Sequence, residues 1–449
     1  MPEIRSMSAQ NTYLAREATP GVAETTGFFS VPGIRMRPGW DGDRETFRGG
    51  GGKVVTTTLG TDEVSPWETE VAACFNHLGI PLASRYGRPT TTTPGGGTNS
   101  RHHDFAISPI AEDAFRAYTA IWGDGFVGLR GVYGYFNDLS VDISRGEVSV
   151  DSSFRSRAVA SGFVAPISEV QTITITGSPT GGTFTITLPF AIGGSGTTAA
   201  IAYNAVASAV KSAIVAIAGG KFTTDDLDVT GGPGPGTPWV VTFKGRYAQQ
   251  NLAIMTCASS LTGGSSPTVG ASETTAGGVP AAMALAPMPS NMWDVYIDST
   301  WAALGTTQYG GAYNAKLEFG EKYDEDMPIN SSIVSYEQPI EKAEQDDTFE
   351  LTLRLGATAL SQFNNLRVGA KQFFRLKLAS DNGPNPYYIE STIPYLCQFD
   401  FCAEIVSRGT IDTAPNSSAV VVPLSLVLTK DPTTGNYAAC RLTNTVTQY

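Results

Sequence analysis

Phe349-Glu350-Leu351-Thr352-Leu353-Arg354-Leu355 alternates large apolar side chains with polar ones. This period of two is typical of a β-strand that buries one face and exposes the other. The same alternation occurs in residues 139–143, 374–378 and 393–401, and residues 420–427 read as a further, buried strand. The sequence therefore predicts a mainly β protein.

The composition favours the same class. The chain has 449 residues, of which 49 are Gly and only 16% are charged. Such a balance favours short strands and turns over long charged helices. A chain of this length suits two or three domains, each large enough to bury its own core.

The charge restricts the partners that the protein can have. The formal net charge is -12 at pH 7, so a general attraction to phosphate, which depends on Lys and Arg, is excluded for the molecule as a whole. An acidic surface repels phosphate at short range. A role in which DNA passes without sticking therefore stays open.

Cysteine usage and hydropathy bear on the compartment. The five cysteines lack the repeated spacing of a disulfide framework, and we expect them to be reduced. The first residues lack the apolar segment of a signal peptide, and no run of about 18 apolar residues could span a bilayer. We therefore expect a protein that is made and used in soluble form, without a membrane partner.

A short helix is predicted from Pro66 to Leu78. Ser65 takes the N-cap position and Pro66 the first helical position. Glu68 and Glu70 then fall in the first turn, where acidic residues favour the positive end of the helix dipole.

One segment, residues 168–278, differs in character from the rest. Alternating Ile and Phe residues between 173 and 188 indicate a hairpin, and apolar residues at spacings of three and four between 203 and 217 indicate a helix. Strands near 227–229 and 239–243 complete a small α+β module. We interpret this segment as an insert, followed by a linker at 279–311.

An internal repeat defines the predicted architecture. Phe75-Asn76-His77-Leu78-Gly79 resembles residues 363–369, Phe-Asn-Asn-Leu-Arg-Val-Gly. In both regions the order is strand, long polar loop, strand, short helix and further strands. We predict two copies of one β domain, at 28–167 and 312–449, with the insert between them and an N-terminal arm at 1–27. Two unrelated β-sandwiches that share this order remain the alternative.

Residues that build catalytic or metal sites are scarce. His77 is interpreted as part of a helix face and His102-His103 as part of a solvated loop, and no other His occurs. Cys397 and Cys402 lie five apart on a predicted strand, which points them to opposite faces as packing residues. The Gly-rich stretches lack the ending of a phosphate-binding loop, and no hydrolase elbow motif is present. We expect no enzymatic activity, no metal and no cofactor.

Residues 13–21 (Tyr-Leu-Ala-Arg-Glu-Ala-Thr-Pro-Gly), residues 297–307 (Ile-Asp-Ser-Thr-Trp-Ala-Ala-Leu-Gly-Thr-Thr) and the insert carry a family resemblance. The insert is the most specific part, through Ile173–Gly177, Gly182–Ile186 and Trp239–Arg246. Together these segments resemble the tail tube (major tail) proteins of bacteriophages with long, non-contractile tails, the siphoviruses.

The resemblance implies a structural virion protein that self-assembles into stacked rings of β-sandwiches around a channel for DNA ejection. Six sandwiches usually make a ring, so a chain with two of them would close as a trimer, a pseudo-hexamer; a hexamer of chains stays open. The implied partners are further copies of the chain, the tape measure, distal tail and terminator proteins, and double-stranded DNA that passes without sticking. The implied location is the virion tail, assembled in the host cytoplasm, with the insert as outer decoration.

The resemblance also implies that polar loops contact other subunits and that acidic residues face the channel. The candidate contacts between rings or subunits are Arg48, Gly49, Gly52, Lys53, Glu321, Tyr323 and Asp324. The candidate acidic residues facing the channel are Glu325, Asp326, Asp346 and Asp347.

Two other function classes are kept as alternatives. A β-sandwich adhesin or tail-tip receptor-binding protein would use the insert to bind a glycan or receptor, for which its exposed aromatic residues are few. A hydrolase with a β-barrel active site is disfavoured because the chain has so few His and lacks paired catalytic groups.

Overall fold

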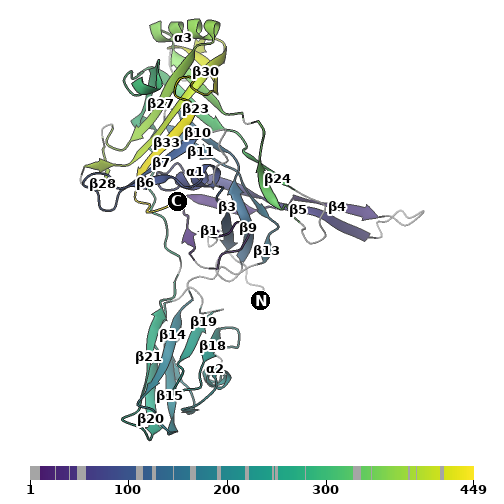
Figure 1. Cartoon of the computed structure of the whole chain (residues 1–449), viewed down its shortest axis with the longest axis vertical. Helices are drawn as coiled ribbons and strands as arrows, with labels where there is room; N and C mark the ends of the chain where they lie inside the picture. The colour runs from purple at the N-terminus through teal and green to yellow at the C-terminus, as the bar shows by residue number, and fades with distance from the viewer. Residues whose placement is uncertain are drawn as a thin grey trace.

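The computed structural model describes residues 11–25, 27–39, 41–47, 57–107, 115–123, 128–144, 146–161, 168–189, 194–217, 222–244, 247, 251–278, 280–326, 335–344, 346–382, 385–390, 392–414 and 419–449. Within these residues the chain is mainly antiparallel β-sheet with short helices (Figure 1). The predicted β class is confirmed at this level. In the same part of the chain, no helix is long and apolar enough to cross a membrane.

The first half of the body precedes the insert. Its elements are β1 (Asn11–Arg16), β2 (Phe29–Ser30), β3 (Ile34–Pro38), β4 (Asp41–Phe47), β5 (Thr57–Val71), α1 (Gly79–Tyr86), β6 (Thr90–Thr92), β7 (Arg101–Ile107), β8 (Tyr118–Gly123), β9 (Gly128–Phe136), β10 (Leu139–Ser144), β11 (Glu147–Asp151), β12 (Phe154–Arg157) and β13 (Ala160–Ser161). Six of the strands pair in the order β1-β8-β9-β12-β5-β3.

The second half of the body follows the insert. Its elements are β22 (Trp293–Asp298), β23 (Ala312–Phe319), β24 (Tyr323–Asp326), β25 (Gln338–Glu341), β26 (Thr348–Arg354), α3 (Ala357–Val368), β27 (Lys371–Ala379), β28 (Tyr388–Glu390), β29 (Ile393–Pro394), β30 (Leu396–Arg408), β31 (Asp412–Thr413), β32 (Val420–Leu428) and β33 (Ala438–Asn444). Six of these strands pair in the order β22-β27-β30-β32-β26-β23.

These two six-strand sets have the same plan. In each half the first strand in the chain lies at one edge and the second strand at the other, and the helix comes between the third and fourth strands. All ten pairings are antiparallel. Each half also places a hairpin in the connection between its second and third strands: β4 with the start of β5, and β24 with β25.

The two halves are joined into one body. Strand β10 of the first half pairs with β23 of the second, from Leu139 opposite Phe319 to Ser144 opposite Asn314. Strand β33 of the second half pairs in turn with β7 of the first. Apolar side chains of both halves belong to a single core, in which Tyr86 packs edge-on against Phe319.

The insert has a core of its own. Its elements are β14 (Val170–Thr176), β15 (Gly181–Pro189), β16 (Ser195–Thr197), β17 (Ile201–Ala202), α2 (Ala207–Val215), β18 (Leu227–Gly231), β19 (Trp239–Phe243), β20 (Thr256–Thr262) and β21 (Thr268–Thr275). These strands pair among themselves in two sheets, around the buried side chains of Ile186, Ile214 and Trp239. The predicted hairpin of residues 173–188 is wrong, because β14 and β15 belong to different sheets.

The predicted helix at Pro66–Leu78 is also wrong. Strand β5 continues to Val71 and pairs with β3 on one side and β12 on the other. Trp67 and Val71 are buried, whereas Glu68 and Glu70 point outward toward Arg side chains of β3. This alternation suits a strand with one buried face, so packing overrides the capping signals. The helix α1 starts only at Gly79.

Two segments predicted to lie outside the sheets contribute strands to them. In the N-terminal arm, β1 pairs along its length with β8 and buries Tyr13 and Leu14. In the linker, β22 pairs with β27. Large apolar side chains anchor both strands, Val295 and Ile297 in the second case.

The short motif that suggested the repeat does not mark equivalent positions. Residues 75–78 form a turn before α1, whereas residues 363–368 lie within α3, which ends at Gly369 in the left-handed conformation. The two halves correspond in strand order and not through this motif. The predicted domain limits themselves stay a prediction.

Candidate assembly interface

The hairpin formed by β24 and β25 carries two of the candidate loop residues, Tyr323 and Asp324, and two of the candidate channel residues, Glu325 and Asp326. It packs on the first half of the body. Residues flanking it contact β9, β12 and α1, which precede it by more than 160 residues in the chain. Through these contacts the second half of the chain packs on the first.

Tyr323 anchors the start of this hairpin. Its side chain is 3% exposed, and its ring packs edge-on against Phe115 and Tyr135, with centroids 5.3 and 5.5 Å away. Its hydroxyl donates to the carbonyl oxygen of Arg85 in α1 over 3.0 Å. Its backbone N–H donates to Oδ1 of Asn137, whose amide donates back to the Tyr323 carbonyl. Tyr323 is therefore a buried intrachain contact, and the prediction that it contacts another subunit is wrong for this side chain.

Tyr336 and Arg157 anchor β25, the second strand of the hairpin. The Tyr336 hydroxyl donates to the carbonyl oxygen of Tyr133 over 2.6 Å. Arg157 Nε donates to the Tyr336 carbonyl over 3.0 Å, and its guanidinium lies 4.6 Å from the Tyr133 ring centre. Burial raises the pKa of Tyr336 well above its ordinary value. The hydroxyl therefore stays protonated and can donate this bond. Sequence reasoning missed both residues, since an Arg on a strand has no distinguishing pattern.

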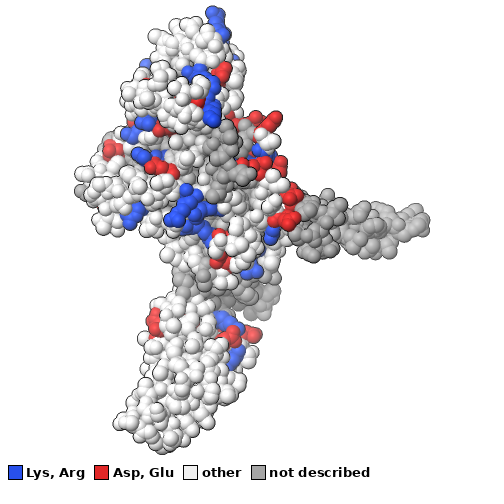
Figure 2. Space-filling view, viewed as in Figure 1, with Lys and Arg blue, Asp and Glu red and all other residues white. Residues whose placement is uncertain are grey.

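The acidic residues of the hairpin are partly neutralised. Glu325 lies 3.0 Å from Arg155 and accepts a hydrogen bond from the Tyr135 hydroxyl. Glu321 contacts Arg155 and Lys342, and the hydrogen bond from Lys342 lowers the pKa of the Glu321 carboxyl. Figure 2 shows acidic groups gathered along this edge of the body. Asp324 is the most exposed of these carboxylates, with 69% of its side chain accessible beside Lys342.

The candidate channel residues divide by burial. Asp347 is 1% exposed and accepts hydrogen bonds from the Tyr437 hydroxyl and the Gly320 N–H, so its proposed exposure to a channel is wrong. Burial raises the pKa of its carboxyl. Glu325 forms an ion pair with Arg155. Asp346 is exposed and Asp326 half-buried, and their role stays a prediction.

Four candidate residues, Arg48, Gly49, Gly52 and Lys53, lie outside the described residues. The strands on either side are described: β4 pairs with β5 from Asp41 opposite Val64 to Phe47 opposite Thr57. The hairpin projects from the body in Figure 1.

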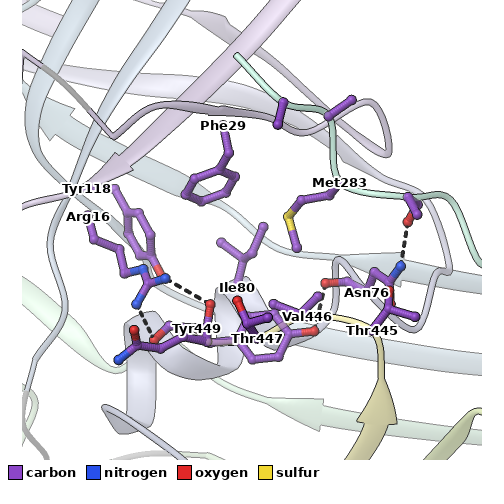
Figure 3. Close-up of a pocket in the computed structure, with 14 residues that line it drawn as sticks. Arg16, Phe29, Asn76, Ile80, Tyr118, Met283, Thr445, Val446, Thr447 and Tyr449 are labelled. Atoms are coloured by element: carbon purple, nitrogen blue, oxygen red, sulfur yellow. Dashed lines mark hydrogen bonds between the residues drawn. The ribbon is translucent and has the colours of Figure 1, made fainter. Parts of the chain in front are cut away.

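A cavity of about 420 Å³ lies where the end of the chain meets β1, α1 and the linker (Figure 3). Arg16 donates to the carbonyl oxygens of Gln448 and Tyr449, and Arg116 donates to that of Tyr449. The Tyr449 ring packs over Gly79, where a Cβ would lie 2.2 Å from it. The polar groups named here are thus bonded within the chain, and the cavity lies where these segments meet.

The histidines serve packing and hydrogen bonding. His102 and His103 lie on β7, not in the predicted solvated loop, and bond to Thr443 and to the Val446 carbonyl of the C-terminal segment. His77 lies in a turn and not on a helix face, and it is fully buried. The five cysteines are free. In the described part of the chain, no group of three or more His, Cys, Asp or Glu side chains could hold a metal ion.

No family model matches the chain, and no curated protein matches it. The site therefore has to be interpreted from its own geometry. Its main feature is a pair of hairpins in corresponding positions. The β24–β25 hairpin packs on the neighbouring half, and the β4–β5 hairpin projects from the body.

Proposed function

We propose that the chain is a structural protein that self-assembles into stacked rings, forming the tail tube through which the DNA of a long-tailed bacteriophage passes. The observation that carries the proposal is the repeated six-strand plan with a hairpin at the same place in each half. A repeated unit whose first copy already binds its second copy has the surfaces needed to bind further copies in the same way.

The duplicated plan favours a ring of three chains. Each chain would supply two tail-tube-type β-sandwiches, so that three copies form a pseudo-hexamer; six copies remain the alternative count. Asp326 and Asp346 are the candidates that keep an accessible carboxylate for the channel. With a net charge of -12, the ring would repel the phosphates of passing DNA. The protein would act as a virion tail component, not an enzyme, with the tape measure, distal tail and terminator proteins as partners.

The insert would decorate the outside of the tube. It has a separate core and extends from one end of the body in Figure 1, and a module of this size in the channel would block it. The same independence supports an adhesin as the second candidate function, in which the insert binds the host surface.

Negative-stain electron microscopy and analytical ultracentrifugation of the purified chain test the proposal. We expect rings with threefold symmetry, or tubes, at high protein concentration or after addition of tail initiator proteins. A chain that stays monomeric under all of these conditions contradicts the proposal. Sixfold rings of single chains would keep the function and overturn the trimeric count.

A further inference from the structure

The surface that receives the β24–β25 hairpin is covered by it within this chain. It consists of β9, β12 and α1 of the first half, which bind Tyr323, Glu325 and Tyr336 of the hairpin. Every residue of α1 is buried. One side of α1 is covered by Lys322 and Tyr323, both of which donate to the Arg85 carbonyl.

In the described part of the chain, no hairpin pairs or packs in this way on the corresponding elements of the second half. By strand order, β30 corresponds to β9, β32 to β12 and α3 to α1. Helix α3 exposes Leu360 and Val368, by 54% and 74%. On the strands, Val406 is 55% exposed and Val427 is 37% exposed. These four exposed apolar side chains lie on the three elements that correspond to α1, β9 and β12, and we call them together the α3 face.

The register of the strands supports the correspondence. Arg155 of β12 lies opposite Pro66 of β5, just after the end of the first hairpin. Val427 of β32 lies opposite Thr348 of β26, next to the end of the second. Where the first half has an Arg held by hairpin residues, the second half has an exposed Val. Exposed apolar side chains on elements whose counterparts are covered are typical of a surface that another protein covers.

The segment that corresponds to the packed hairpin is the first half's own hairpin. Strand β4 pairs with β5 and with no other described strand. Figure 1 shows β4 and the start of β5 projecting from the side of the body, whereas α3 lies at the top. Its strands include two large apolar residues, Phe47 and Leu59.

We propose that the α3 face of one copy binds the β4–β5 hairpin of a second copy, as the first half binds β24–β25 within the chain. The inference rests on the proposed self-assembly and names the contact that makes it. Each copy has one hairpin and one face, so the contact is head-to-tail, and repeated contacts close a ring when the rotation between copies allows it.

Paired substitutions on the face test this contact. The variant Leu360→Glu with Val406→Glu places charges on the α3 face, and we expect assembly to need at least tenfold more protein, because buried apolar anchors dominate such contacts. The matched control is Val206→Glu with Leu285→Glu, at residues that are also exposed, by 55% and 60%, but lie outside the face. Sedimentation velocity gives the assembly state, and thermal unfolding shows that both variants fold.

Complementation makes the test specific to the hairpin. A second variant, with residues 43–62 replaced by Asn-Gly, keeps the α3 face and lacks the hairpin. At concentrations where the wild type assembles, neither variant alone should do so. Their mixture should form one-to-one dimers and nothing larger, because each dimer has one hairpin bound and no further matching pair.

The outcomes separate this inference from the proposed function. Wild-type assembly together with equal assembly of the face variant overturns the α3 face contact alone. A monomeric mixture of the two variants, beside an assembling wild type, does the same. A wild-type chain that never assembles overturns both proposals.

Discussion

His77 is buried without a hydrogen-bond partner for either ring nitrogen among the described residues. Gly33 makes room for it, since a Cβ there would lie 2.6 Å from His77 Nδ1. Burial lowers the pKa of His77 from 6.5 to about 4, because the charged imidazolium would lose its hydration. The neutral ring acts as a packing group.

This burial predicts a loss of stability in acid. The unfolded chain binds a proton at His77 below the ordinary histidine pKa of 6.5, whereas the folded chain does so only near 4. The free energy of unfolding is therefore unaffected by protonation of His77 above pH 6.5 and decreases as the pH falls toward 4. The loss amounts to about 3 kcal/mol at roughly 1.4 kcal/mol for each pKa unit. Urea unfolding gives the free energy of unfolding between pH 7 and 4. For His77→Leu this free energy should decrease over that range by about that amount less than for the wild type.

The control for this experiment is His102→Gln. His102 is only half-buried and bonds to Thr443, so its removal should change the pH dependence less. Identical pH profiles for wild type and His77→Leu would contradict the assigned role of His77.

Single residues also show what the sequence could have revealed. Asp347 has the same parity as Phe349 and Leu351, so the alternation of β26 itself places it on the buried face. Its pairing with Tyr437 could not be predicted, because the partner lies 90 residues away.

At the scale of elements, the hairpin β24–β25 depends on side chains that lie far from it in the sequence. Arg157 holds the second strand of the hairpin through the Tyr336 carbonyl and packs on the Tyr133 ring. A hydrogen bond from a charged group with a cation–π contact contributes about 2 kcal/mol.

Removal of this anchor should loosen the hairpin. We expect Arg157→Ala to lower the free energy of unfolding by about 2 kcal/mol and to speed amide hydrogen exchange in residues 335–341. The matched control is Arg37→Ala, which removes an exposed ion pair with Glu68 and should cost less than about 1 kcal/mol. If exchange in residues 335–341 is the same in both variants, Arg157 does not hold the hairpin.

Elements differ in how far their sequence determines them. Strand β26 follows from its alternation alone. The segment at 66–71 has the caps of a helix and the alternation of a strand, and its pairing with β3 and β12 decides between them. Local signals cannot report such pairings, since β3 and β12 are distant in the chain.

At the scale of the molecule, element order was more informative than sequence similarity. The order of strand, loop, strand and helix occurs in both halves, yet the five-residue motif that drew attention to it lies in a turn in one half and in a helix in the other. The cross-pairing of β10 with β23 and of β33 with β7 has no sequence signal, because antiparallel edges pair through backbone groups.

The separate core of the insert predicts that it can be removed. We expect a chain in which residues 168–278 are replaced by a short Gly-Ser linker to unfold within about 4 °C of the wild type and to assemble equally well. The isolated segment should unfold cooperatively. Loss of assembly on deletion would contradict its role as decoration, and loss of host-cell binding by assembled particles would favour the adhesin.

The two ends of the insert lie on neighbouring strands, since Val170 of β14 is paired with Thr275 of β21. The body therefore meets the insert at one narrow point, and any foreign module whose own ends are close together could take that position. Under the proposed function, exchange of such modules between lineages would change the outside of the tail in a single recombination event. The same attachment point could carry an enzyme or an antigen in many regularly spaced copies.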